Sequence, residues 1–287
     1  MAASTHSDRS GKPLRVAVIG HVEHVTVGRV AAIPTSGQIA HLEDPCFCPG
    51  GGGGIAFSQL AKSPAEVHLF TAIGTGEAGA LVAAELARSG ASIHVARRAD
   101  GHTRDLVMIA PDGERTIVVI GQPLHPQASD PLPWQVVAEC DAAYFTAQDP
   151  DALRTARAAR VLVVTARRRA ALDRSGVRAD VVVGSAFDPR EASTLADYRV
   201  PPAALVLTEG SRGGRIETEE STLRFAAPAQ ALRVGAYGAG DSFAGALTFY
   251  LAAHLPLPSA CARAALHGAA VLRGFHPLSQ QLPLSLP

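Results

Sequence analysis

Near its C-terminal end the chain reads Leu232-Arg-Val-Gly-Ala-Tyr-Gly-Ala-Gly-Asp-Ser-Phe-Ala-Gly-Ala-Leu247. Apolar residues recur every three or four positions after Asp241, which predicts a helix that begins at the turn Gly238-Ala239-Gly240. Because glycine has no Cβ, a ligand can come close to the backbone of this turn. The first N–H groups of a helix have no partner within it and favour negative charge, so the turn is a candidate anion site.

Asp241 places a carboxylate beside this candidate anion site. Such a carboxylate can accept a proton from a hydroxyl, while the N–H groups stabilise the charge on a phosphoryl group in transfer. A simpler interpretation is that Asp241 only caps a helix that follows a glycine turn. The stretch alone favours neither interpretation.

The composition sets wide bounds on the rest of the chain. Its 287 residues are 47% hydrophobic, enough for one large α/β domain or two small ones. Positive and negative side chains balance at 26 each, so nothing favours a nucleic-acid partner or a membrane surface. The four cysteines lack zinc-ligand spacing, the N-terminal residues do not resemble a secretory signal, and no apolar run reaches membrane length. We therefore expect a cytoplasmic protein.

Strand-like apolar runs alternate with helix-like segments from Leu14 onward, which predicts an α/β fold with a mainly parallel sheet covered by helices on both faces. The turn Pro111-Asp-Gly-Glu114 between two β-type runs predicts a hairpin that projects as a lid. We expect a disordered tail over 1–13, one domain over 14–275 with lid segments at about 21–48 and 92–121, and a loose tail over 276–287.

Two further glycine-rich stretches precede predicted helices. Gly50 to Gly54 is a run of five glycines, which favours close approach of a ligand over a flexible loop. It is not a Walker A loop, because no Lys-Ser or Lys-Thr follows it. Gly74-Thr-Gly-Glu-Ala-Gly79 matches the dinucleotide fingerprint, with Asp100 about twenty residues further on, so a nicotinamide-dependent oxidoreductase is a competing hypothesis.

Two other segments have simpler interpretations. Ser185-Ala-Phe-Asp188 follows a predicted strand, where its carboxylate is either near a ligand or part of a loop turn. Arg167-Arg-Arg169 is most simply a solvated helix face.

The order of these features resembles the ribokinase-like (PfkB) carbohydrate kinase family from about Leu14 to Gly274. Four stretches carry the resemblance, of which the last is the specific one: Gly50–Gly54, Ile73–Gly79, Thr208-Glu-Gly210-Ser-Arg-Gly213 and Gly238-Ala-Gly-Asp241-Ser-Phe243. The resemblance implies a three-layer α/β/α sandwich with a small β lid. It also implies a cytoplasmic kinase that uses ATP and Mg²⁺ and acts on a sugar or nucleoside-like small molecule. The oligomeric state stays open, but exposed edges of lid strands often pair between subunits, which favours a homodimer through the lid.

The resemblance also assigns roles to individual residues. Asp241 would be the general base, with the anion hole at Gly238, Ala239 and Gly240. The residues implied to contact ATP are Thr208, Gly210, Gly213 and His267. Those implied to contact the acceptor are Glu23, Gly51, Gly52 and Arg104. Asp188 is implied to bind the metal.

The sequence departs from the family pattern mainly at the sugar end. Val25 stands where the family carries a sugar-binding aspartate, and Glu23, on the same side of the strand, is the replacement that we expect. Ile55 and Ala56 occupy the place of a usual asparagine, and Ser185 replaces another near the metal. These losses motivate a second hypothesis, a protein with the kinase fold that binds a sugar or nucleotide with little or no catalytic activity.

Overall fold

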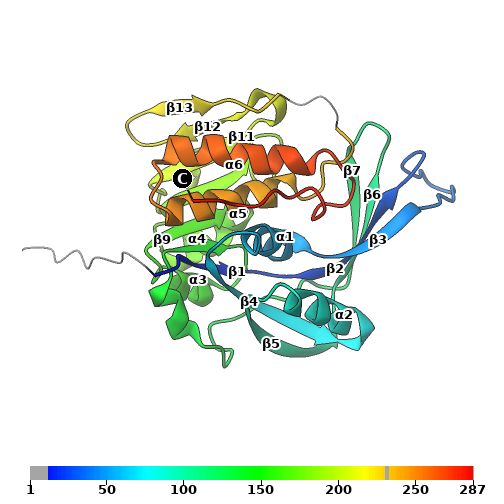
Figure 1. Ribbon diagram of the computed structural model, residues 1–287, viewed down its shortest axis with the longest axis horizontal. Coiled ribbons are helices and arrows are strands. Elements are labelled where there is room, and N and C mark those ends of the chain that lie inside the picture. Colours follow the sequence, from blue (N-terminus) through cyan, green and yellow to red (C-terminus); the bar gives the residue numbers. More distant parts are fainter. Residues whose placement is uncertain (1–11, 230–232, 287) are drawn as a thin grey trace, which may run out of the picture.

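The computed structural model describes residues 12–229 and 233–286 (Figure 1). Within them the large sheet consists of β1 (Arg15–Ile19), β4 (Glu66–Thr75), β5 (Ser92–Gly101), β8 (Ala142–Phe145), β9 (Val161–Thr165), β10 (Val181–Ser185), β11 (Ala204–Thr208), β12 (Gly214–Glu217) and β13 (Thr222–Phe225). Its strand order is β13-β12-β11-β10-β9-β8-β1-β4-β5. Neighbours from β11 to β5 are parallel, whereas β12 and β13 form an antiparallel edge. The prediction of a mainly parallel sheet is confirmed.

Helices cover both faces of this sheet, as predicted. The first face carries α1 (Gly51–Leu60), α2 (Gly76–Ala87), α5 (Ala239–Ala252) and α6 (Leu257–Val271), and the second carries α3 (Pro150–Ala156) and α4 (Arg169–Ser175). Strand β1 shows why its sequence is continuously apolar: Val16 and Val18 join the core under the first set, while Ala17 and Ile19 join the core under the second. No helix among residues 12–229 and 233–286 is long and apolar enough to span a membrane.

A second, smaller sheet lies at one end of the molecule, beyond the ends of α5 and α6 (Figure 1). Its strands follow the order β3 (Glu43–Gly50), β2 (Glu23–Arg29), β6 (Arg104–Ile109), β7 (Arg115–Ile120). Strands β6 and β7 pair antiparallel around the predicted turn, so the hairpin is confirmed. The expected lid segment from residue 92 was too long, because β5 pairs in parallel with β4 and completes the large sheet.

The C-terminal tail is not loose, contrary to our expectation from the sequence. Lys62 at the end of α1 donates to the carbonyls of Leu278 and Gln281. The Gln281 side chain is buried and donates to the Ile55 carbonyl at 3.0 Å and to the Ser242 hydroxyl at 2.9 Å. The tail thus ties α1 to α5, the two helices whose first turns carry the glycine motifs. The N-terminal tail expected over 1–13 lies outside the described residues as far as residue 11.

Candidate active site

The glycine run and the Gly-Ala-Gly-Asp motif meet at the carboxyl ends of the central parallel strands. Gly50 precedes α1, and Gly51 begins it with a φ of +71°, a conformation that favours glycine. A Cβ built on Gly52 would lie 3.1 Å from Asp241 Oδ1 and 2.9 Å from Thr146 Oγ1. The missing side chain at Gly52 is therefore what lets the Asp241 carboxylate approach the start of α1.

Asp241 lies in the first turn of α5, after Gly238, whose φ is +81°. Its carboxylate forms no hydrogen bond or ion pair with any residue that the structure describes. Burial, followed by the nearby negative charge of Glu191, raises the pKa of Asp241 to about 6. Arg167 and Arg115 act in the opposite direction. The unpaired carboxylate is thus poised to exchange a proton near neutral pH.

The backbone N–H groups of Ala239, Gly240 and Asp241 are also available. Within the described parts of the chain none of the three has a hydrogen-bond acceptor, and the first bond of the helix is donated by Ser242 to the Gly238 carbonyl. A side chain added at Gly240 would meet no atom within 4 Å, so the space beside these groups is open. Free N–H groups at a helix start are a suitable site for phosphate.

Two carboxyl groups face this region from the small sheet. Glu23 on β2 and Asp105 on β6 are both buried, and burial followed by their mutual hydrogen bond raises the pKa of Glu23. Burial also raises the pKa of Asp105, so the pair shares a proton. Glu23 Oε2 is 3.0 Å from the position of a Cβ on Gly51, so this carboxyl group lies against the glycine run. The structure thus brings Glu23 together with Gly51, two of the residues expected to bind the acceptor.

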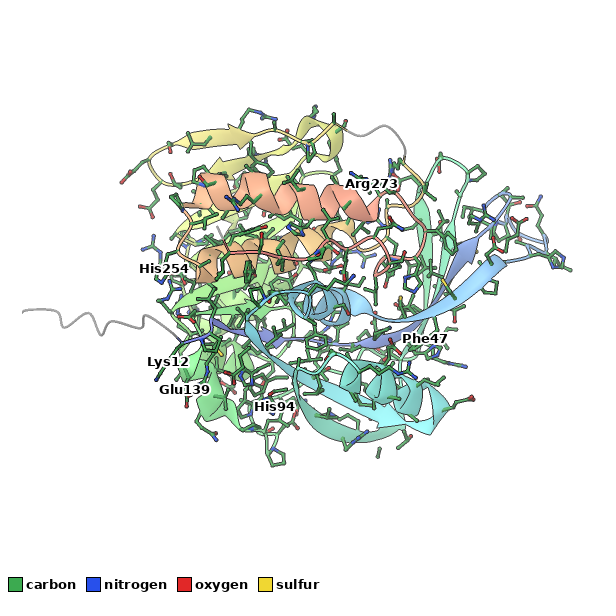
Figure 2. All side chains as sticks on the ribbon, in the orientation of Figure 1. Lys12, Phe47, His94, Glu139, His254 and Arg273 are labelled. Carbon is green, nitrogen blue, oxygen red and sulfur yellow. The ribbon has the colours of Figure 1, made fainter. Side chains whose placement is uncertain are left out.

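The other predicted acceptor residue, Arg104, lies elsewhere. It is exposed on β6 next to Asp105, and neighbouring residues on a strand point to opposite faces. Its register partner His24 stacks on Phe47, which lies on the small sheet (Figure 2). Arg104 therefore shares the face of His24 rather than that of Glu23, so the structure does not bring it together with the other residues expected to bind the acceptor.

Basic groups line the same region from β1 and from the turn after β9. His21 Nε2 lies 3.8 Å from Glu23 Oε1 and 3.4 Å from the Gly52 N–H, and its ring centroid is 5.0 Å from that of His125. Arg168 Nε donates to the Thr146 carbonyl at 2.8 Å. Burial, then the charges of His125 and Arg168, lowers the pKa of His21 well below its usual value, so His21 is neutral.

The carboxylate expected to bind a metal is already engaged. Asp188 Oδ2 accepts from Arg167 Nη2 at 2.6 Å, and Oδ1 accepts from the Arg190 N–H at 2.9 Å. Burial alone would raise the pKa of Asp188, but these donors outweigh it and lower the pKa. Glu191 is the nearest second carboxylate, and it too is bonded to Arg167.

This arrangement does not fit a magnesium ion held by the protein. Magnesium is bound through free carboxylate oxygens and water, whereas the oxygens of Asp188 and Glu191 all accept hydrogen bonds from the chain itself. Among residues 12–229 and 233–286 no group of three metal-binding side chains comes together. The expected role of Asp188 as a metal ligand is therefore not supported by its geometry.

The residues expected to contact ATP lie at the end of β11. Thr208 ends the strand and donates to the Gly184 carbonyl, and Gly210 and Gly213 both have positive φ angles, +59° and +84°. This glycine turn follows β11, which lies next to β10 in the strand order. Glu23 follows β1, which is four strands away from β11 in the same sheet. His267 was expected here as well, but it is only 4% exposed and bonds to the Tyr250 hydroxyl at 3.0 Å. It belongs to the packing of α5 against α6, so the structure does not place it with the glycine turn after Thr208.

Sequence reasoning missed several residues that line the site. Asp105, Glu191 and His21 stand outside any motif. The places of Asp105 within a predicted strand and of His21 just after one were the signals for these two, and Glu191 had none. Arg167 and Arg168 were interpreted as a solvated helix face, whereas the first is ion-paired and the second is partly buried beside Thr146. The competing dinucleotide pattern has a packing explanation, since a Cβ on Gly74 would lie 2.5 Å from the Asp100 carbonyl oxygen and 2.7 Å from the His102 nitrogen.

Residues 179–278 match the family model described as pfkB family carbohydrate kinase. The resemblance is thereby confirmed, and the matched segment contains β10, β11 and the Gly-Ala-Gly-Asp motif. A search of curated protein sequences gives no significant match.

Solved structures share the fold over nearly the whole chain. Adenosine kinase from Sinorhizobium meliloti is 17% identical with a TM-score of 0.74, covering 93% of this chain and 96% of its own. Arabidopsis thaliana ribokinase, solved with ribose and ATP, is 15% identical with a TM-score of 0.73 over 94% and 95%. Phosphofructokinase-2 from Escherichia coli, solved with substrates and products, is 16% identical with a TM-score of 0.71 over 91% and 94%. The fold is ribokinase-like, with a three-layer body and a small second sheet.

Proposed function

We propose that this chain is an ATP-dependent carbohydrate kinase, which transfers the γ-phosphate of ATP to a hydroxyl of a sugar or nucleoside-like small molecule. The observation that carries the proposal is the unpaired carboxylate of Asp241 beside the unpaired N–H groups of Ala239 and Gly240. Phosphoryl transfer needs alignment and charge stabilisation more than covalent help from the protein, and this geometry offers both.

In the proposed mechanism each part of the site has one task. Asp241 takes the proton of the acceptor hydroxyl, and the N–H groups at the start of α5 stabilise the charge of the phosphoryl group. The pair of Glu23 and Asp105 shares one proton, so it can both donate to and accept from acceptor hydroxyls. The glycine turn after Thr208 holds the nucleotide. No step in this scheme is assigned to a metal ion bound by the protein.

The direct test is a screen for ADP release. The purified protein with ATP is offered a panel of pentoses, hexoses, sugar phosphates and nucleosides, and at least one acceptor is expected to give ADP together with a phosphorylated product. The second hypothesis, a binding protein without catalysis, is favoured by the engagement of Asp188 with Arg167 and by the buried Val25. Tight binding of an acceptor and ATP without any product would support it and contradict the kinase proposal.

The pH dependence provides a second test. Because Asp241 must be ionised to accept a proton, kcat/KM is expected to fall about tenfold per pH unit below its pKa of about 6, and to level off above it. The profile is measured with the acceptor found in the screen, at saturating ATP and with the fold checked at each pH. A profile that stays flat between about pH 4.5 and 8 contradicts the role of Asp241 as the base.

The proposal of a homodimer through the lid is supported by β7. This strand is the edge of the small sheet, and its residues Ile117 to Ile120 are 42% to 49% exposed. An exposed apolar edge strand is a surface on which a second copy can pair.

A further inference from the structure

Arg167 lies between Asp188 and Glu191, two acidic residues that follow β10 and are called the acid pair below. Its Nη2 atom lies 2.6 Å from Asp188 Oδ2 and 2.7 Å from Glu191 Oε1, and its Nε donates to the same Glu191 oxygen at 3.0 Å. The other oxygen of Glu191 accepts from the Ser185 N–H at 2.9 Å, and that of Asp188 accepts from the Arg190 N–H. All four carboxylate oxygens are thus satisfied by the chain, and among the described residues Arg167 is the one whose guanidinium bonds to both carboxylates.

The same guanidinium lies within electrostatic reach of the proposed transfer site. Its neighbour Arg168 donates to the Thr146 carbonyl at 2.8 Å, and the Thr146 hydroxyl and Asp241 Oδ1 lie 2.9 Å and 3.1 Å from a Cβ built on Gly52, so the turn that carries Arg167 borders the proposed site. The charge of Arg167 also lowers the pKa of Asp241, against the larger effects of burial and of Glu191. The Arg167 side chain is 37% exposed, and its Nη1 atom has no partner among the residues that the structure describes. A guanidinium presents its five N–H groups in a fixed fork, so two N–H groups remain free to bind an anion.

We propose that Arg167, held in place by Asp188 and Glu191, binds the terminal phosphate of the nucleoside triphosphate at the position where a protein-held divalent cation would otherwise stand. The inference rests on the proposed function and deepens it by assigning the missing positive charge. A fixed cation that needs no reorganisation is an effective stabiliser of charge in phosphoryl transfer. Asp188 and Glu191 are then positioning residues, which restrain the arginine rather than touch the nucleotide.

The first experiment compares ATP with ADP, since only ATP carries the terminal phosphate. Calorimetric titrations of wild type, Arg167→Met and Arg167→Lys are run without added metal and again with magnesium. We expect Arg167→Met to weaken ATP binding by about tenfold to a hundredfold, as for the loss of a charge-assisted hydrogen bond, and to change ADP binding less than about threefold. Arg167→Lys restores part of the loss because it keeps the charge. Arg169→Met is the matched control, an exposed arginine two residues away without an ion pair to any described residue.

The second experiment needs no nucleotide and measures whether Asp188 and Glu191 bind a divalent cation. Electron paramagnetic resonance of Mn²⁺ is used to titrate wild type, Arg167→Met and the double variant Arg167→Met/Asp188→Asn. With the arginine gone, the freed carboxylates are expected to bind Mn²⁺ at least tenfold more tightly than wild type does, and the double variant is expected to lose that gain. Thermal unfolding of every variant establishes that the fold persists.

The outcomes separate this inference from the function on which it rests. If wild type binds ATP and Arg167→Met binds it equally well, the role of Arg167 is wrong and the kinase proposal stands. If wild type binds Mn²⁺ as tightly as Arg167→Met does, the acid pair is a metal site in spite of the arginine, and the inference is overturned. If wild type binds no ATP under any condition, the proposed function fails and the inference fails with it.

Discussion

Asp241→Asn is expected to lower kcat by about 10²- to 10⁴-fold, the usual contribution of a general base, while the Kd for ATP changes less than about threefold. Asparagine keeps the size and the hydrogen-bonding reach of the carboxylate but cannot accept a proton. The measurement pairs initial rates of ADP release, with the acceptor identified by the screen, with calorimetry of ATP binding. A variant that keeps full turnover would contradict the assigned mechanism.

The same substitution is expected to make the protein more stable, which separates a functional role from a structural one. The pKa of Asp241 is raised from 3.8 to about 6 in the folded state, so ionisation costs folding free energy at any pH above both values. Removing the charge should recover at most about 3 kcal/mol of unfolding free energy at pH 8, a shift of several degrees in the thermal midpoint. This gain shrinks as the pH falls through 6 and vanishes below about 4, where the carboxyl group is protonated in both states.

Asp100→Asn is the matched control for both measurements. Asp100 is exposed on β5, and its side chain forms no hydrogen bond with any described residue. It is also the acidic residue that the competing dinucleotide fingerprint would require. Unchanged turnover and an unchanged thermal midpoint are expected for Asp100→Asn. A large loss of activity in this variant would bring the oxidoreductase hypothesis back into consideration.

The features that could be predicted from the sequence are local in the chain. The anion site is one contiguous stretch, and the strands could be recognised because a parallel strand such as β1 is buried on both faces and must be apolar throughout. The glycine run could be recognised as one contiguous stretch, and the structure shows its use, since a Cβ on Gly51 or Gly52 would crowd groups about 3 Å away. In each case one segment carries both the sequence signal and the residues of the proposed site.

The features that could not be predicted depend on pairing between distant segments. Asp105 reaches Glu23 only because β2 and β6 pair in parallel in one register, and a shift by one residue would have placed Arg104 there instead. Arg167 meets Asp188 because β9 and β10 are neighbours. The sequence shows which residues are charged but not which of them meet in space. An arginine in an ion pair therefore cannot be distinguished from a solvated arginine by sequence alone.

The similarity to the family model is also confined to one part of the chain. The family model matches residues 179–278, which hold the glycine turn after Thr208 and the Gly-Ala-Gly-Asp motif, and leaves residues 1–178 unmatched. The departures at Val25 and Ile55 lie in that unmatched part. Under the proposed function, the chemistry of ATP constrains the matched end of the site, whereas the proposed acceptor end, with Glu23 and Asp105, follows the substrate.

Gly52→Val is expected to lower kcat by about 10²-fold or more, because displacing a reacting group by about 1 Å has an effect of that size. The first atom of any side chain at this position would come within 2.9 Å of Thr146 Oγ1 and 3.1 Å of Asp241 Oδ1, and the branches of valine would come closer still. The Asp241 carboxylate must then turn away from the start of α1, where the acceptor hydroxyl is proposed to lie. ATP binding is expected to change little, because the nucleotide turn after Thr208 lies on the other side of the site.

Gly101→Val is the matched control, since a Cβ on Gly101 would meet no atom within 4 Å and its φ is not positive. Rates of ADP release, ATP affinity and thermal midpoints are compared for the two variants. Gly52→Ala should be intermediate, because a methyl group needs shifts of only a few tenths of an ångström from its neighbours. If Gly52→Val instead keeps its turnover, the Asp241 carboxylate does not act from its place beside the glycine run, and the acceptor must bind on another side of that residue.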